Sequence, residues 1–363
     1  LRASFLVAMS GRQVAFLCPT TILAQQHYDN FRKRLNGWPL EVRMLSRFQT
    51  RSEQKKIIEE LKTGICDIVI GTHRLLSDDV GFRELGLLVI DEEQRFGVVQ
   101  KEKLKKLKKT VDTLTLSATP IPRTLEFSLL GLRDLSMIQT PPPDRQAIQT
   151  ELIHFNPQLI REAILRELER GGQVFFVHNR VQGLEQIARW LSNLVPEAKI
   201  GVAHGQMPER RLEEVMRDFY QKKYDVLVST AIIESGLDLP RANTIIINRA
   251  EQFGLAQLYQ LRGRIGRSKE KGYAYLVVPS RSELKGDALK RLKALKEFSE
   301  LGSGFRLAAY DLKLRGAGNL LGKEQSGHIS RIGYELYVKL LERKIKELKG
   351  EKLEEEFEPE IRL

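Results

Sequence analysis

The residues with the clearest potential for chemistry are acids at the end of an apolar run. The run is LLVI at residues 87–90, and Asp91, Glu92 and Glu93 follow it directly. Burying a carboxylate without a partner is costly, so acids placed there form either a surface turn or a site. Phosphoryl transfer needs one carboxylate to hold Mg²⁺ and a second group to orient water. Because acids also cap helices at strand exits, this pattern alone leaves both interpretations open.

A second group of candidate residues is basic. Arg262, Arg264 and Arg267 lie within six residues of one another and are interleaved with Gly263 and Gly266. Glycine costs up to about 1 kcal/mol in a helix interior, which disfavours a plain solvated basic helix. We therefore favour the interpretation that these arginines stabilise the negative charge of a transferred phosphate.

These residues must be positioned by a fold in which short apolar segments alternate with amphipathic ones. Near-continuous apolar strands separated by helices favour a parallel sheet covered on both faces. The fold class is therefore α/β, with two doubly wound units in tandem, and no sequence repeat between the two units is apparent. Predicted strands cover residues 13–18, 41–45, 65–70, 87–90, 113–116, 148–155, 173–178, 199–203, 226–229, 244–247 and 273–278. Predicted helices cover residues 21–35, 51–62, 157–170, 182–194 and 209–222.

Proline and glycine mark the domain boundaries. The stretch TPPPDRQ at 140–146 cannot continue a helix or a central strand, so it predicts a linker. After Pro279 we expect a hairpin of helices over 288–301 and 305–314, a Gly-rich loop and a helix over 331–349. The predicted domains are a first lobe (1–140), a linker (141–147), a second lobe (148–282), the hairpin and loop (283–327), and a C-terminal helix with an acidic tail (328–363).

The composition points to a polyanionic partner. The net charge is +12, although residues 350–363 hold six glutamates against one lysine and one arginine. Nucleic acid ranks ahead of a membrane surface, and a Lys/Glu-rich thermophile surface is the alternative. No run of about 18 apolar residues predicts a membrane span. With only Cys18 and Cys66 and no secretory layout, we expect a cytoplasmic protein without disulfides.

Short motifs occur along both predicted lobes. The first-lobe motifs are PTT at 19–21, GTH at 71–73, DEEQ at 91–94 and SAT at 117–119. The second-lobe motifs are HNR at 178–180, HGQM at 204–207, STAIIESGLDLP at 229–240 and QLRGRIGR at 260–267. In these motifs and in their order along the chain, the sequence resembles the superfamily 2 helicases. RGAGNLLGKEQSG resembles the translocation motif shared by RecG helicases and transcription-repair coupling factors (the Mfd family). SRFQTRSEQ and IGYELYVKLLERKI resemble the latter family.

The resemblance implies two RecA-like lobes that use ATP and Mg²⁺. It implies that Asp91 holds the metal and that Glu92 polarises the attacking water, with Gln94, Gln260, Arg264 and Arg267 as further catalytic residues. The remaining implied residues are Gly236 and Asp238 lining the nucleotide cleft, Ser117, Thr119, Arg315 and Gln325 coupling nucleotide state to movement, and Pro19, Thr20, Thr21, Thr72, Arg74, Arg180, His204, Gly205 and Thr230 contacting DNA phosphates.

The function implied is an ATP-dependent double-stranded DNA translocase module of a transcription-repair coupling factor. The whole protein would displace stalled RNA polymerase and recruit nucleotide excision repair through UvrA, using regions upstream of this sequence. One alternative is a RecG-like branch-migrating helicase. Another is a hydrolytically inactive DNA- or protein-binding module, because the sequence contains no G-x-x-x-x-G-K-[ST] phosphate loop. The first residues resemble the helix that follows such a loop, so we expect the fragment to start just after it.

Overall fold

The structure is a computed structural model that describes most of the two predicted lobes. It describes residues 1–47, 49–117, 145–231, 239–267, 269–279 and 286–298, and single positions at 134, 136, 138, 140, 304, 306, 307 and 310. Most of the predicted second hairpin helix, the Gly-rich loop, the C-terminal helix and the acidic tail lie outside these residues. In the described part of the chain, no helix is long and apolar enough to cross a membrane.

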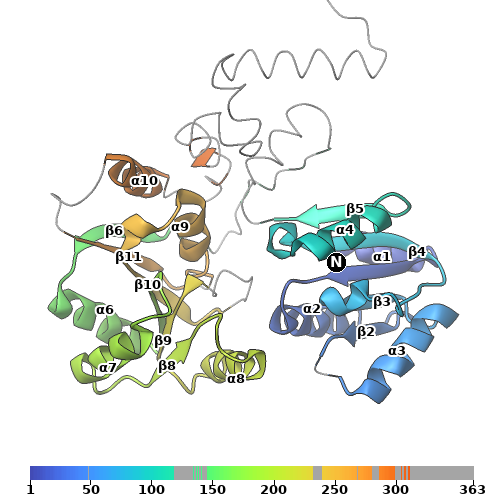
Figure 1. Cartoon of the computed structure of the whole chain (residues 1–363), viewed down its shortest axis with the longest axis horizontal. Coiled ribbons are helices and arrows are strands. Elements are labelled where there is room, and N and C mark those ends of the chain that lie inside the picture. Colours follow the sequence, from blue (N-terminus) through green and yellow to red (C-terminus); the bar gives the residue numbers. More distant parts are fainter. Residues whose placement is uncertain are drawn as a thin grey trace, which may run out of the picture.

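The first lobe contains a five-stranded sheet in which every pairing is parallel (Figure 1). The strand order is β2–β3–β1–β4–β5. The strands are β1 (Gln13–Leu17), β2 (Val42–Leu45), β3 (Ile68–Gly71), β4 (Leu85–Asp91) and β5 (Asp112–Leu116). Because all strands run the same way, their carboxyl ends share one edge of the sheet, where ligands of open α/β sheets bind.

Helices cover both faces of the first sheet. The helices are α1 (Arg2–Met9), α2 (Thr21–Arg34), α3 (Arg51–Thr63) and α4 (Val98–Leu107), with 3-10 turns η1 (His73–Leu76) and η2 (Glu93–Arg95). Apolar side chains of α1 and α2 pack on one face, and those of α3 and α4 pack on the other. Local chemistry fixes their ends: Thr50 and Glu53 form a capping box at the start of α3, and Gly64 ends it with φ of 82°.

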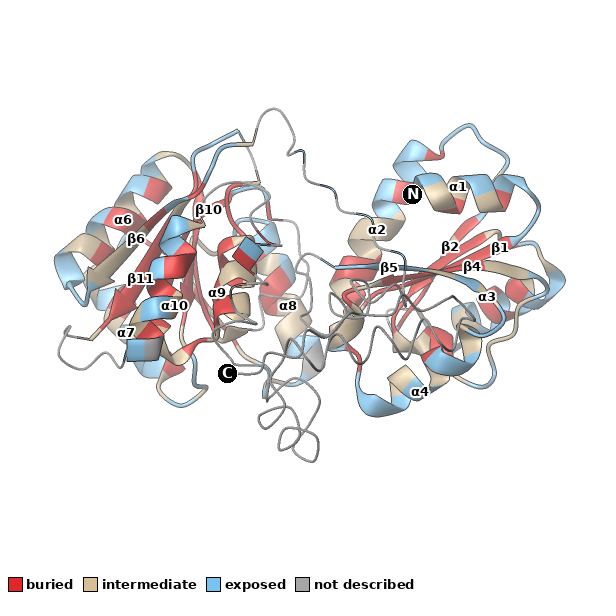
Figure 2. Cartoon of the chain, turned by 90° about the horizontal axis from the view of Figure 1, so that it is seen from above, coloured by how far each residue is buried: buried red, intermediate tan, exposed pale blue. Residues whose placement is uncertain are grey.

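The second lobe repeats this design with six parallel strands in the order β6–β11–β10–β7–β9–β8. The strands are β6 (Gln149–His154), β7 (Gln173–Val177), β8 (Ile200–Ala203), β9 (Val226–Ser229), β10 (Ala242–Asn248) and β11 (Tyr273–Val278). The helices are α6 (Pro157–Glu169), α7 (Leu184–Leu194), α8 (Glu209–Tyr220), α9 (Leu255–Arg262) and α10 (Gly286–Glu297), with the 3-10 turn η4 (Ala250–Gln252). The interior strands β1, β3, β7, β9 and β10 are the most buried parts of the lobes, whereas β5 and β6 are largely exposed (Figure 2).

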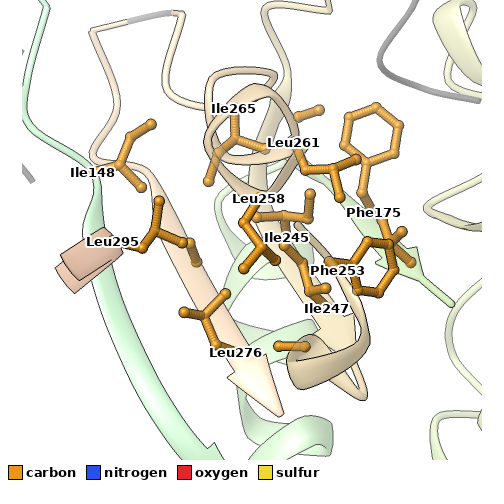
Figure 3. Close-up of a cluster of buried hydrophobic side chains, with 14 of the residues drawn as sticks. Ile148, Phe175, Ile245, Ile247, Phe253, Leu258, Leu261, Ile265, Leu276 and Leu295 are labelled. Atoms are coloured by element: carbon orange, nitrogen blue, oxygen red, sulfur yellow. The ribbon is translucent and has the colours of Figure 1, made fainter. Parts of the chain in front are cut away.

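The core on one face of the second sheet joins the strands to α8, α9 and α10. Leu258 and Leu261 of α9 are fully buried against Ile245 of β10, and Leu295 of α10 completes the cluster (Figure 3). On the other face, α6 and α7 pack with side chains such as Ile164 and Leu191. The doubly wound fold predicted from the sequence is therefore confirmed in both lobes.

The two lobes correspond element by element. Strands β1, β2, β3, β4 and β5 match β7, β8, β9, β10 and β11 in both chain order and sheet order. Helix α1, which precedes β1, matches α6, which precedes β7. In this correspondence β6 is the extra strand, and no described strand takes its place on the outer side of β5.

The structure adds detail to the predicted elements. The strand predicted over 87–90 runs over Leu85–Asp91, so Asp91 is the last residue of the strand and not the first of a loop. Helix α9 was not predicted, because the glycines of RGRIG appeared to exclude a helix. The helix ends at Gly263, so only its last turn reaches the arginine-rich segment.

Candidate active site

The acidic loop begins where β4 ends, at the carboxyl edge of the first sheet. Asp91 is mostly buried, with 19% of its side chain exposed, and its Oδ2 atom lies 3.2 Å from Nε2 of His27 on α2. The His27 ring packs on Phe16 of β1, with the ring centroids 4.6 Å apart. Nothing in the sequence near His27 indicates this contact, because α2 brings His27 to Asp91 from 64 residues away.

Glu92 occupies a strained turn directly after the strand. Its φ and ψ are 51° and 53°, the left-handed region that residues with a Cβ rarely adopt. The side chain is 5% exposed, and its backbone N–H donates to the carbonyl of Leu116 at 2.9 Å. The Gln94 amide donates to the Glu92 carboxylate, while its own Oε1 is buried without a partner among the described residues.

The third acid has a different environment. Glu93 forms an ion pair with Lys108 at 2.6 Å, and the hydroxyl of Thr115 donates to it at 3.4 Å. Its charge is thus compensated within the lobe, which separates it from Asp91 and Glu92. Ser117 lies just beyond β5 and is exposed, whereas Thr119 is outside the described residues.

The first-lobe residues expected to contact nucleic acid follow β1 and β3. Thr20 caps α2 by accepting from the backbone N–H of Leu23 at 3.4 Å, and Thr21 is buried. Thr72 is buried and its hydroxyl has no partner among the described residues. Arg74 is held by Asp79 through two hydrogen bonds of 2.7 and 2.6 Å, and its guanidinium keeps the pKa of Asp79 below its usual value.

Both cysteine thiols of the first lobe are buried and held in their neutral form. Cys18 follows β1, directly before Pro19, and burial, with a smaller contribution from the nearby Asp91 charge, raises the pKa of its thiol well above the usual value. Cys66 is also buried, and its pKa is raised to about 12, chiefly by burial. Both thiols are free, as the sequence predicted.

The second-lobe residues lie at the carboxyl ends of β7, β8 and β9. Arg180 follows β7 and is exposed, and Thr230 follows β9. His204 and Gly205 follow β8, and Nδ1 of His204 is buried without a partner among the described residues. Gly236 and Asp238 lie outside the described residues. The parallel topology therefore brings the described members of this set to one edge of the second sheet.

The three arginines of RGRIGR have three different environments. Arg262 is buried, and its guanidinium donates to the carbonyls of Leu295 and Phe298 at 2.8 Å each. It ties α9 to α10, and burial lowers its pKa. Arg264 is also buried, at 4% exposed. Arg267 donates through Nε to the carbonyl of Gly263 at 3.3 Å. Arg262 is therefore a packing residue, whereas sequence reasoning had grouped it with the other two.

One described hydrogen bond joins the acidic loop to the arginine-bearing helix. Nη2 of Arg95, in η2, donates to Oε1 of Gln260, in α9, at 3.4 Å. Arg95 lies three residues after Glu92, and Gln260 lies four residues before Arg264. The sequence offered no reason to select Arg95, because its partner is 165 residues away.

The donor set suits a hard cation and a phosphate. Carboxylate oxygens are the ligands that Mg²⁺ prefers, and Asp91 and Glu92 supply them at one strand end. The buried, unsatisfied Oε1 of Gln94 provides a further acceptor beside them. Within the described part of the chain there is no cluster of His, Cys, Asp and Glu that forms a complete metal site.

Comparison with known families places these elements among the helicases. The DEAD/DEAH box helicase family matches residues 3–127, and the helicase conserved C-terminal domain matches residues 156–269. The two matches cover the acidic loop and the arginine-rich segment. In a solved structure of RecG bound to a three-way DNA junction, 44% of the chain aligns with 92% of this one at 38% identity and a TM-score of 0.72.

Comparison with individual protein sequences identifies a more specific group of similar proteins. Transcription-repair-coupling factors from Myxococcus xanthus and Staphylococcus aureus (strain USA300) are each 55% identical, over 363 and 361 residues. The chain spans 30% and 31% of the length of these relatives. It belongs to the superfamily 2 helicases, with the tandem helicase domains found in transcription-repair-coupling factors.

Proposed function

We propose that this chain is the ATP-dependent, double-stranded DNA translocase module of a transcription-repair coupling factor. The observation that carries the proposal is the hydrogen bond between Arg95 and Gln260. It links the turn that holds Glu92 with the helix that leads to Arg264 and Arg267. A contact of this kind is what a motor needs if hydrolysis is to change the relation between its lobes.

Each acid has a separate role in the proposed hydrolysis. Asp91, held by His27, would bind the Mg²⁺ of Mg-ATP, which supplies charge stabilisation to the transferred phosphate. Glu92, held by Gln94, would accept a proton from the attacking water. Arg264 and Arg267 would stabilise the charge on the phosphate, with Gln260, Gly236 and Asp238 lining the same cleft.

A phosphate-binding loop would have to come from chain outside this sequence. The correspondence between the lobes supports this, because β6 lies beside β11 and leads into α6, whereas β5 has no described outer neighbour. Leu114 and Leu116 of β5 are 40% and 38% exposed, which is unusual in a parallel sheet. We infer that a strand leading into α1 pairs with β5 and carries the loop between them.

Nucleic acid would lie along the carboxyl edges of the two sheets. The residues proposed to touch its phosphates are Pro19, Thr20, Thr21, Thr72, Arg74, Arg180, His204, Gly205 and Thr230. Phosphate contacts carry no sequence information, which suits a motor that moves along any duplex. Ser117, Thr119, Arg315 and Gln325 would couple the nucleotide state to each step. In the whole protein, RNA polymerase and UvrA would be bound by other regions.

A triplex-displacement assay tests the proposal. A longer form that includes the phosphate loop should displace a third strand from duplex DNA only when ATP is present. Arg315→Ala should keep its ATPase and lose displacement, because Arg315 is assigned to coupling. ATP hydrolysis without any displacement by the unmodified protein would contradict the translocase assignment.

The similarity to RecG favours a second candidate, a branch-migrating DNA helicase. The two candidates differ in their substrate. A coupling factor should release RNA polymerase stalled on duplex DNA, whereas a branch-migrating enzyme should unwind forked DNA. Fork unwinding with no effect on stalled polymerase would favour the second candidate.

A further inference from the structure

The turn that presents Glu92 in the first lobe is repeated in the second lobe. Residues 90–100 read IDEEQRFGVVQ, and residues 247–257 read INRAEQFGLAQ. Both begin at the end of a central strand, continue through a 3-10 turn and a phenylalanine, and enter a helix after a glycine. The similarity is short and was not apparent from the sequence until the strands were matched.

The backbones of the two turns agree closely. Arg249 takes the place of Glu92, with φ and ψ of 54° and 53° against 51° and 53°. Phe96 and Phe253 are buried and extended, with φ of −80° and −95°. The hydrogen bonds also match: the N–H of Arg95 donates to Glu92, and that of Gln252 donates to Arg249, at 2.9 and 3.0 Å.

An arginine in this conformation costs free energy that glycine or asparagine would avoid. Strained residues of this kind cluster where a side chain must be presented in a fixed position. In the first lobe the strained position holds Glu92, the proposed water-orienting acid. Arg249 is exposed, so burial of its side chain does not account for its presence.

Arg249 lies in a cluster of basic residues where two neighbouring strands end. Strands β10 and β7 pair in parallel with Ile247 opposite Val177, so their exits lie next to each other. Two hydrogen bonds join the residues at the ends of these strands. One links Nδ2 of Asn248 and Nδ1 of His178 at 3.3 Å, and in the other Nδ2 of Asn179 donates to the carbonyl of Gln252 at 3.5 Å. After burial, the guanidinium groups of Arg249 and Arg180 are the main causes that lower the pKa of His178.

Among the residues that the structure describes, neither Arg180 nor Arg249 has a carboxylate oxygen within 4.0 Å. Two guanidinium groups at one strand edge, without such a partner, suit an anion that each can bind through paired N–H donors.

We propose that Arg249 is a phosphate-binding residue which, held in the left-handed turn beside Arg180, contacts a phosphodiester group of nucleic acid. The proposal rests on the proposed function, since it adds a residue to the nucleic-acid edge of the second lobe. The same chemistry would suit the phosphates of a nucleotide. The cluster lies with the residues of the HNR segment, which favours the nucleic-acid backbone.

Salt-dependent binding of the chain to a fluorescent DNA duplex tests the proposal. Loss of one phosphate contact makes the negative slope of log K against log salt shallower by about 0.9. We therefore expect Arg249→Ala to reduce the magnitude of the slope by that amount and to weaken binding about three- to tenfold at low salt. The matched control is Arg241→Ala, which removes an exposed arginine at the amino end of the same strand.

A second variant separates binding from folding. Arg249→Gly relieves the left-handed strain, so its melting temperature should rise while its DNA affinity falls as in Arg249→Ala. Arg249→Lys keeps the charge and should restore part of the affinity. If Arg249 had only a structural role, Arg249→Gly would have a lower melting temperature and an unchanged DNA affinity. That result would overturn the proposal.

The remaining outcomes identify which claim fails. If the unmodified chain binds no DNA at any salt, the proposed function fails together with this inference. If it binds and the Arg249 and Arg241 variants have equal slopes, only this inference fails. Arg249→Ala in the longer form could instead weaken binding of a fluorescent ATP analogue and leave the salt dependence of DNA binding unchanged. In that case Arg249 binds a phosphate of a nucleotide, and the nucleic-acid assignment is wrong.

Discussion

Arg262 is expected to be a major stabilising contact between α9 and α10. Its buried guanidinium donates to the carbonyl of Leu295 in α10 and to that of Phe298 directly after the helix. It also stacks over Tyr259, with the guanidinium carbon 5.0 Å from the ring centroid. Replacing it by methionine keeps the apolar stem and removes both hydrogen bonds. Arg262→Met should therefore loosen α10 without emptying the core around Leu261.

The magnitude follows from these contacts. Hydrogen bonds from a charged donor contribute about 1.5–3 kcal/mol each, and the contact with Tyr259 adds about 0.5–1 kcal/mol. Burial of the guanidinium, which lowers the pKa of Arg262, offsets part of this. We expect a net loss of about 2–4 kcal/mol in the free energy that holds α10 in place.

Native-state hydrogen exchange measures this loss directly. Amide protection in α10 should fall about 30- to 700-fold, while protection in α2 and α3 of the first lobe should not change. Lys296→Met is the matched control, because it removes an exposed charge from the same helix. Protection in α10 that falls by less than about fivefold, or equally in the control, would refute the reasoning.

Three further predictions concern other parts of the molecule. Arg95→Ala should lower the DNA-stimulated ATPase rate of the longer form about 5- to 30-fold, because the hydrogen bond to Gln260 is lost. An unchanged rate would show that Arg95 does not contribute to hydrolysis. Gly172→Ala should destabilise the chain by about 1–3 kcal/mol in urea unfolding, because the new Cβ would lie 1.7 Å from Oε1 of buried Glu167; an unchanged midpoint would contradict this. Burial lowers the pKa of His178 below 6.5, so the unfolded chain binds the proton more readily and stability should fall as pH drops from 7 through 6.5. His178→Gln should reduce this dependence of the melting temperature on pH. An equal pH dependence in the two proteins would contradict the prediction for His178.

The sequence was sufficient to predict the strands and the lobes. Parallel strands that are buried on both faces leave a continuous apolar run, as in Val226–Ser229, so their positions are encoded locally. Helix α9 was missed because Gly263 and Gly266 argue against a helix in the arginine-rich segment, although LAQLYQLR at 255–262 consists mainly of good helix formers. Its glycines lie after the helix end, where they carry no helical penalty.

Residues that act through distant partners could not be predicted. Nothing near His27 in the sequence indicates that it meets Asp91, and nothing near Arg262 indicates that it meets α10. Arg249 is different, since the pattern INRAEQFG repeats IDEEQRFG at a fixed place relative to a strand. Alignment of the two halves at the phenylalanine and glycine would have selected it.

The measurement that tests the central claim most directly compares Glu92→Gln with Glu93→Gln in the longer form. Glu92 is the proposed water-orienting acid, whereas Glu93 is already paired with Lys108. Glu92→Gln should lower DNA-stimulated ATP hydrolysis at least about 100-fold, with ATP affinity unchanged within about threefold, while Glu93→Gln keeps most of the activity. Equal activity in the two variants, or loss of ATP binding in Glu92→Gln, would contradict the assignment of this loop as the site of hydrolysis.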